Sequence, residues 1–221
     1  VGSPINDLYK QNASLLRNKD FSIDSLIMAH PASAVPAYFL ANNLSYQFDL
    51  NQLKVLRGKF DASLDGTAYI KQLESIIARL EKVQVGAIAP DFTLPDTEGN
   101  PVSLSSFRGK YVLVDFWAAW CPDCRKENPS IVKAWNQDKD KNFTVLGVSL
   151  DRTKEAWLAA IEKDNLTWTH VSDLKDWSSD VAVLYAIRWV PTSFLLSPEG
   201  EILAVGLEGE DLLNKLAEVL K

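Results

Sequence analysis

Both cysteines of this 221-residue chain lie in one short segment, FWAAWCPDCRKENP at residues 116–129, where a proline and an aspartate separate them. The run YVLVDFW at residues 111–117 is hydrophobic almost throughout and predicts a buried central strand. The residues from Cys121 to about 136 suit a helix. At such a strand-to-helix junction, free backbone N–H groups and the helix dipole stabilise a thiolate at the first cysteine. The fold must therefore present a dithiol at the first turn of a helix.

Three uses of this Cys-Pro-Asp-Cys pair remain open from the residues alone. A zinc site normally needs four protein ligands, and only His30 and His170 could join the two cysteines. A purely structural disulfide would stabilise little, because so short a loop removes little chain entropy. Redox exchange fits best: Cys121 attacks a partner disulfide, and Cys124, one turn later, resolves the mixed disulfide. That chemistry needs no cofactor and no metal.

The first part of the chain, residues 1–84, is expected to be a small all-α domain. Apolar residues recur there at three- and four-residue spacing, most clearly over residues 69–83, which indicates one buried helix face. Ser22 and Asp49 stand where helix N-caps are expected. No cluster of titratable side chains interrupts the apolar stripes, so this part is interpreted as structural.

The remaining residues, 85–221, alternate between strand and helix patterns, which predicts an α/β domain with a central sheet flanked by helices. A further hairpin is expected ahead of the sheet, around residues 98–100. Thr153 is expected to cap one of the helices. The strands are predicted at residues 111–117, 142–150, 192–197 and 201–206, and the helices at residues 121–136, 153–164, 179–187 and 209–221.

The charge of the chain excludes one class of partner. A formal net charge of −6 argues against nucleic acid, since phosphate binding needs a basic face. The acid excess lies in residues 86–221, where 14 Lys and Arg stand against 21 Asp and Glu, a net charge of −7. No apolar run approaches the roughly 18 residues of a membrane span. The chain begins at Val1 without a signal peptide, which fits a processed or truncated form of a longer precursor.

The segment VLVDFWAAWCPDC resembles the active-site segment of thioredoxin, with Trp120 directly before the dithiol and Pro129 eight residues after the first cysteine. AIRWVPTSFLL, at residues 186–196, resembles the thioredoxin segment that carries a cis-proline. The resemblance implies that Pro191 is cis and that the backbone of Val190 pairs with an incoming substrate; an ordinary trans proline at a strand start is the alternative. It also implies that Trp120 contacts the substrate.

A narrower resemblance covers residues 85–221. The APDF start, the leading hairpin, the L-F-R-G-K pattern before the central strand, and Glu plus Pro after the dithiol are similar to the TlpA/ResA-like branch of bacterial envelope thioredoxins, which is related to the AhpC/TSA and Redoxin proteins. The helical region resembles the N-terminal extension of envelope members with a DUF4369-type domain. The resemblance implies a periplasmic or envelope location, protein disulfide or dithiol substrates, an envelope or membrane electron donor, membrane anchoring of the precursor, and a role in cytochrome c maturation.

Two carboxylates match residues that tune the dithiol in these families. Asp115 matches the buried aspartate of thioredoxin, which implies that it accepts a proton from Cys124 during exchange; burial in an apolar strand would raise its pKa to suit that task. Glu127 matches a glutamate of the ResA-like branch that influences the titration of the dithiol. A strand-end aspartate facing water and a solvated helix glutamate are the structural alternatives.

The two residues between the sulfurs, Pro122 and Asp123, are expected to contact substrate and to set the redox poise. A carboxylate at Asp123 disfavours a thiolate at Cys121, which favours a reductase over a strong oxidant. Arg125 and Lys126 act in the opposite direction.

Two other functions are weighed against a protein thiol–disulfide oxidoreductase. Peroxiredoxins share the APDF opening, but their cysteine usually follows a Pro-x-x-x-Thr-x-x-Cys pattern, and the corresponding positions here are Val114 and Ala118. A partner-binding module with the dithiol as a redox latch is the other alternative. Against it stands the complete set of Asp115, Cys121, Cys124 and Pro191.

Overall fold

A computed structural model describes residues 22–220 and divides the chain into two compact units, residues 1–78 and residues 79–221. The boundary falls within one helix, α5 (Ala68–Lys82). Residues 1–21 of the expected helical domain, with the start at Val1, lie outside the described part of the chain. The two units are described separately.

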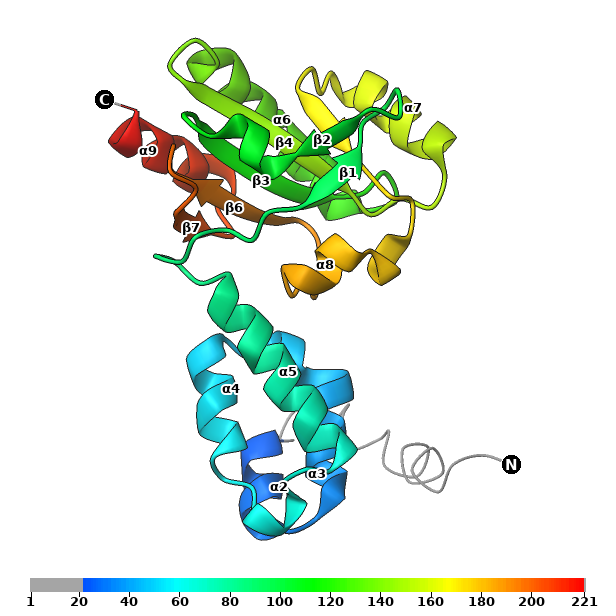
Figure 1. The fold of residues 1–221 in the computed structure, drawn as a ribbon, viewed down its shortest axis with the longest axis vertical. Coiled ribbons are helices and arrows are strands. Elements are labelled where there is room, and N and C mark those ends of the chain that lie inside the picture. Colours follow the sequence, from blue (N-terminus) through cyan, green and yellow to red (C-terminus); the bar gives the residue numbers. More distant parts are fainter. Residues whose placement is uncertain (1–21, 221) are drawn as a thin grey trace. The chain divides into compact units, whose positions relative to one another are not determined.

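The described part of the first unit is helical (Figure 1). Ser22 Oγ accepts the Ser25 N–H, and Asp49 forms a capping box with Gln52, which confirms both expected N-caps. The helix over Ala34–Phe39 continues as a π-helix over Leu40–Leu44 and a 3₁₀ turn over Ser45–Gln47. The helices of this unit are α2 (Ile23–Ala29), α3 (Ala34–Phe39), α4 (Leu50–Arg57) and α5. Its core side chains include Ile27, Leu40, Leu53, Ile70 and Leu73.

The second unit is built on a five-stranded mixed sheet of order β5-β4-β3-β6-β7, which confirms the predicted fold class. The central strand β3 pairs in parallel with β4 and antiparallel with β6. β5 continues the parallel side, and β7 the antiparallel side. The predicted hairpin is also present, as β1 paired with β2. The strands are β1 (Thr93–Pro95), β2 (Pro101–Ser103), β3 (Tyr111–Trp117), β4 (Phe143–Ser149), β5 (Thr169–Val171), β6 (Thr192–Leu196) and β7 (Ile202–Val205).

Helices cover the sheet, and the pleat of β3 sorts its side chains between two cores (Figure 1). Leu113 and Trp117 pack with α6 (Pro122–Asp138), α7 (Lys154–Asp164) and α9 (Gly209–Val219). The alternate residues of β3 pack on the other core with the hairpin and with α8 (Asp180–Leu184). Residue 115 has the same parity as 113 and 117, so the strand directs it toward the dithiol helix α6.

Two local predictions needed correction, and one strand was not predicted. Thr153 occupies the N-cap position of α7 but makes no side-chain capping hydrogen bond. The helix expected over residues 179–187 is confined to the five residues of α8. Strand β5 has no counterpart among the predictions, because three residues are too few to display a period. Among residues 22–220, no helix is both long and apolar enough to cross a bilayer.

Candidate active site

The dithiol lies at the start of α6, directly after the loop that leaves β3. Cys121 is the N-cap of this helix, and its Sγ accepts the Cys124 backbone N–H at 3.1 Å. Pro122 occupies the first helical turn, where its missing N–H has no cost. The two sulfurs form a disulfide, and both cysteines are buried, Cys121 at 4 % exposure and Cys124 at 1 %. When the disulfide is reduced, the Cys121 thiol therefore lies at a helix N-terminus, as its position in the sequence predicts.

A loop from far along the chain lies against the first sulfur. The Val190–Pro191 peptide bond is cis, which confirms the expectation from the resemblance. Cys121 Sγ lies 3.6 Å from the Val190 carbonyl oxygen, although 69 residues separate the two in sequence. This contact follows from the pairing of β6 with β3, since β6 begins directly after Pro191.

Asp115 is buried in the middle of β3, at 3 % exposure, so a carboxylate facing water is excluded. Burial, together with the smaller effect of the Glu127 charge, raises its pKa to about 7. A carboxyl group with this pKa both accepts and donates a proton near neutral pH. It lies on the face of the sheet that packs against α6, the helix that carries Cys124.

Glu127 is partly buried and bonded, rather than freely solvated. Its Oε1 accepts the Gly209 N–H at 2.8 Å, at the first residue of α9. Burial raises the pKa of Glu127, and this hydrogen bond opposes the rise. The side chain therefore connects the dithiol helix to the last helix of the chain.

We expect Glu127→Gln to lower the pKa of Asp115, because the substitution removes the carboxylate whose charge raises it. The shift should be below about one unit, since burial is the larger cause. It is measurable as the midpoint of the Asp115 carboxyl signal in an NMR pH titration. Replacing the exposed Glu155 with Gln is the control and should leave the midpoint in place. An unchanged midpoint in Glu127→Gln would contradict the electrostatic coupling.

The charges flanking the dithiol are paired. Asp123 Oδ1 lies 2.8 Å from Lys126 Nζ, and both side chains are exposed. Arg125 forms a bidentate pair with Asp164, with Nη2 to Oδ1 at 2.6 Å, and Asn128 donates to the same carboxylate. The two cations expected to oppose Asp123 therefore each have an acidic partner.

Two side chains, those of Asp151 and Arg125, hold the loop between β3 and the dithiol. The sequence did not indicate that they act on the same residue. Both carboxylate oxygens of Asp151 accept the Ala119 N–H, at 3.1 and 3.0 Å, and Oδ2 also accepts the Ser149 hydroxyl at 2.8 Å. Arg125 Nη1 donates to the Ala119 carbonyl at 3.3 Å. The signal that could have found Asp151 is a polar residue after a buried strand adjacent to β3, since parallel strands end at the same edge of a sheet.

Replacing Asp151 with alanine is expected to lower the free energy of unfolding by about 2 kcal/mol, because the buried Ala119 N–H and Ser149 hydroxyl lose their acceptor. Urea unfolding of the oxidised chain measures this loss, and the exposed Asp140→Ala is the matched control. Equal stability of the two variants would show that Asp151 does not hold the loop.

Trp120 lies beside the dithiol with its indole 48 % exposed, and its Nε1 donates to the Leu150 carbonyl at 3.2 Å. Pro122 and Asp123 are also exposed. These three residues form the surface next to the sulfurs, as a substrate contact requires. Val114 and Ala118, at the positions where peroxiredoxins carry Pro and Thr, are fully buried.

His170, the histidine of the second unit, is not placed with the cysteines as a metal ligand. His170 is on β5, buried against Trp168 with ring centroids 5.6 Å apart, and burial lowers its pKa to about 3. His30 is at the end of α2 in the other unit. Over residues 22–220, no group of three or more His, Cys, Asp or Glu side chains is placed to hold a metal ion.

A mixed sheet with a Cys-x-x-Cys disulfide at a helix start and a cis-proline loop beside it defines a thiol–disulfide oxidoreductase of the thioredoxin fold. The AhpC/TSA family model matches residues 85–205. The chain belongs to the AhpC/TSA family.

Named relatives point to the same class. The thiol-disulfide oxidoreductase ResA of Bacillus thuringiensis subsp. konkukian is 30 % identical over 141 residues, 64 % of this chain and 79 % of that protein. ResA of Geobacillus kaustophilus is 34 % identical over 120 residues, 54 % of this chain and 67 % of that protein. The thioredoxin domain of a thiol-disulfide oxidoreductase from Bacteroides vulgatus is 47 % identical, with a TM-score of 0.60, and the match covers 62 % of this chain and 99 % of that domain. The chain is an enzyme of this class.

Proposed function

We propose that this chain reduces disulfides in other proteins through Cys121 and Cys124, in an envelope compartment. The observation that carries the proposal is the position of Cys121. Its sulfur is at a helix start, accepts the Cys124 N–H, and lies 3.6 Å from the Val190 carbonyl. A substrate cysteine brought to that sulfur would find backbone groups of the Val190–Pro191 loop beside it.

The reaction proceeds in two exchanges that start from the dithiol form. The Cys121 thiolate attacks one sulfur of the substrate disulfide, a mixed disulfide forms, and the second substrate sulfur leaves as a thiolate that takes up a proton. Cys124 then loses its proton and attacks the Cys121 sulfur, which releases the other substrate thiol. The substrate gains two electrons and two protons, and the chain is left with the Cys121–Cys124 disulfide seen in the structure.

Asp115 and Glu127 serve the second exchange in this proposal. Cys124 is almost fully buried, so its thiol cannot lose a proton directly to bulk water. Asp115, with a pKa of about 7 and on the sheet face that packs against α6, is the base. Glu127 maintains the raised pKa of Asp115 through its charge.

The direction of electron flow follows from the charges around Cys121. A strong oxidant needs a highly stabilised thiolate in its reduced form. Here Asp123 is in the first turn of α6, Lys126 is paired with it, and Arg125 is paired with Asp164. We therefore expect a reduction potential closer to about −270 mV than to about −120 mV, measured by equilibration with glutathione buffers. A value at the oxidising end would overturn the reductase assignment.

The compartment and partners rest on the resemblance to the TlpA/ResA-like branch. In an oxidising envelope, the disulfide form must be reduced again by an envelope or membrane electron donor. Protein disulfides are the substrates, and apocytochrome c is the narrower candidate. In this proposal residues 85–221 carry the chemistry, and the helical region before them corresponds to the N-terminal extension of envelope members with a DUF4369-type domain.

Reduction of insulin by the dithiol form tests the activity against its two alternatives. Consumption of the thiols by hydrogen peroxide alone, without a disulfide substrate, would favour a peroxidase. Full function of Cys121→Ser in cells would favour a binding module.

A further inference from the structure

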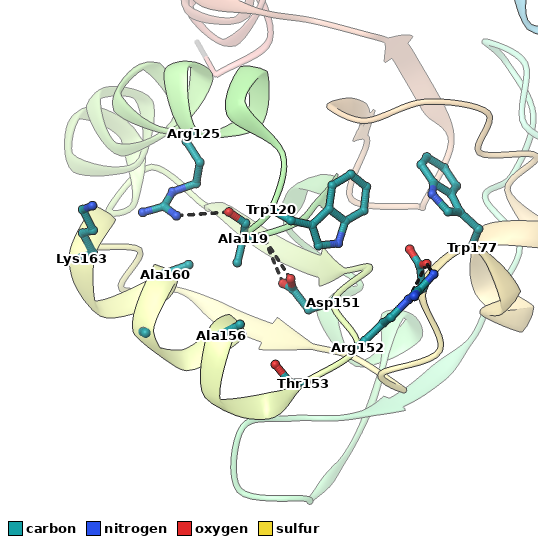
Figure 2. A pocket seen from close by; sticks show the side chains of 12 residues that line it. Ala119, Trp120, Arg125, Asp151, Arg152, Thr153, Ala156, Ala160, Lys163 and Trp177 are labelled. Carbon is teal, nitrogen blue, oxygen red and sulfur yellow. Dashed lines mark hydrogen bonds and ion pairs between the residues drawn. The ribbon is translucent and has the colours of Figure 1, made fainter.

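A cavity of about 690 Å³ lies directly beside the dithiol loop, on the side of Trp120 (Figure 2). Its floor is one face of α7, where Ala156, Ala159 and Ala160 carry only methyl side chains. The bulky Trp157 of the same helix is directed into the core and leaves this face open. A volume of this size is in the range that binds ligands and exceeds a single side chain.

Two tryptophans form the rim of the cavity. Trp120 and Trp177 are 48 % and 42 % exposed, and their ring centroids are 6.0 Å apart. Exposed indoles of this kind are typical of protein contact surfaces, because they bring a large apolar area with few rotatable bonds. Trp120 is adjacent in sequence to Cys121, so the rim includes the residue directly before the reactive cysteine.

One carboxylate of the lining is turned toward the protein rather than toward the cavity. Asp176 lines it and is only 8 % exposed. Its Oδ2 accepts from Arg152 at 2.8 and 2.5 Å, but its Oδ1 is buried and accepts no hydrogen bond. Because this oxygen has almost no accessible surface, a chain bound in the cavity would not reach it, and Asp176 serves to hold Arg152 at the edge of the cavity.

The exposed charge around the cavity is positive, in contrast with the net charge of −7 over residues 86–221. The two acidic residues of the lining, Asp151 and Asp176, are buried and engaged with the protein. Lys163 and Arg152 have exposed side chains. Figure 2 shows Lys163 and Trp177 at opposite ends of the cavity.

We propose that this cavity, named here the α7 groove and formed by Trp120, Trp177, Asp176, Lys163 and the alanine face of α7, binds the extended polypeptide segment next to the reactive cysteine of the substrate. An aromatic or branched aliphatic side chain of that segment lies on the alanine face between the indoles. An acidic side chain meets Lys163. The inference rests on the proposed exchange function and adds a preferred substrate sequence to it.

The spacing of the preferred residues follows from the geometry. From Ala156 to Lys163 the helix rises about 10 Å, at about 1.5 Å per residue. An extended segment covers that length in about three residues, at about 3.3 Å each. The preferred substrate therefore carries its apolar residue near the cysteine and its acidic residue about three positions further away.

The test measures how fast the reduced full chain reacts with two peptide disulfides that differ only in having Phe or Ser two residues from the cysteine. Stopped-flow tryptophan fluorescence gives the rates. We expect the Phe peptide to react about tenfold faster, from burial of one aromatic side chain. Ala156→Leu/Ala159→Leu fills the groove at two exposed helix positions and should bring the ratio close to one. Glu162→Leu adds a leucine to α7 outside the groove and should preserve the ratio.

The charge is tested separately with peptides that carry Glu or Lys at the further position. The native chain should prefer the Glu peptide by about two- to threefold, and Lys163→Glu should reverse that preference. Lys110→Glu makes the same charge change at the residue before β3, at the end of that strand away from the dithiol. This variant should keep the preference for the Glu peptide. Equal rates for the Phe and Ser peptides, or a ratio that survives the double leucine variant, would overturn the groove assignment. Failure of the native chain to react with either peptide or with oxidised glutathione would overturn the exchange function itself.

Discussion

Replacing Cys124 with serine is expected to leave a chain that attacks a substrate once and then remains attached to it. Cys121 keeps its place at the helix start, so the first exchange still proceeds. Without the second thiol nothing attacks the mixed disulfide, and turnover of insulin should fall by roughly 10³-fold or more. A covalent adduct of chain and substrate, visible on non-reducing gels and released by reductant, measures this result.

Cys121→Ser is the matched comparison, because it loses the attacking thiol and keeps the resolving one. We expect the same loss of turnover and no adduct. An adduct with Cys121→Ser, or none with Cys124→Ser, would reverse the roles of the two sulfurs. The difference in burial supports the assignment, since Cys124 is the more enclosed of the two.

Asp115 is expected to make the oxidised chain less stable as the pH rises. Its pKa is about 7 in the folded chain against an ordinary value of 3.8, so between these values the folded state holds a proton that the unfolded state has lost. The free energy of unfolding therefore falls from its full value below pH 4 until the pH passes 7, by on the order of 4 kcal/mol. Asp115→Asn cannot ionise and should lack this fall.

The measurement is the difference in urea-unfolding free energy between the native chain and Asp115→Asn at pH 5 and at pH 8. The difference between the two chains isolates the effect of Asp115 from those of Asp91 and Asp164. The pKa values of these two carboxyls are lowered in the folded chain, so their contribution to stability is lost as the pH falls. The exposed Asp140→Asn should parallel the native chain. In the reduced enzyme, Asp115→Asn should also slow resolution of the mixed disulfide by about 10²-fold. A difference that does not change with pH would show that Asp115 titrates normally.

The local parts of the site could be predicted because their signals are local. The hydrophobic run of β3, the cysteine spacing and Pro122 at the start of α6 are all within fourteen consecutive residues, 111–124. The cis bond before Pro191 was also expected, but only through the resemblance of its flanking sequence. The alternation of strand and helix patterns was sufficient to predict the α/β fold class of residues 85–221.

The parts that the sequence did not reveal depend on long-range pairing. Asp151 reaches Ala119 only because Trp117 of β3 is in register with Ser149 of β4. Glu127 finds the Gly209 N–H 82 residues away. In the sequence, the alanines of α7 are typical helix formers. Their second role, in lining the groove, depends on the neighbouring loops. Periodicity describes one element at a time and cannot show which side chains meet across elements.

The order in which the site is synthesised has a consequence for the cell. A ribosome completes the cysteines 69 residues before Val190, and β6, the strand after that loop, is the neighbour of β3 on its antiparallel side. Until β6 pairs, the nascent chain presents two thiols without the loop that lies against Cys121 and without β6 and β7, two of the five strands of its sheet. A chain released early, before residue 190, would expose the dithiol without the loop whose backbone we propose to meet the substrate. The contact between Cys121 and Val190 is therefore among the last parts of the site to form.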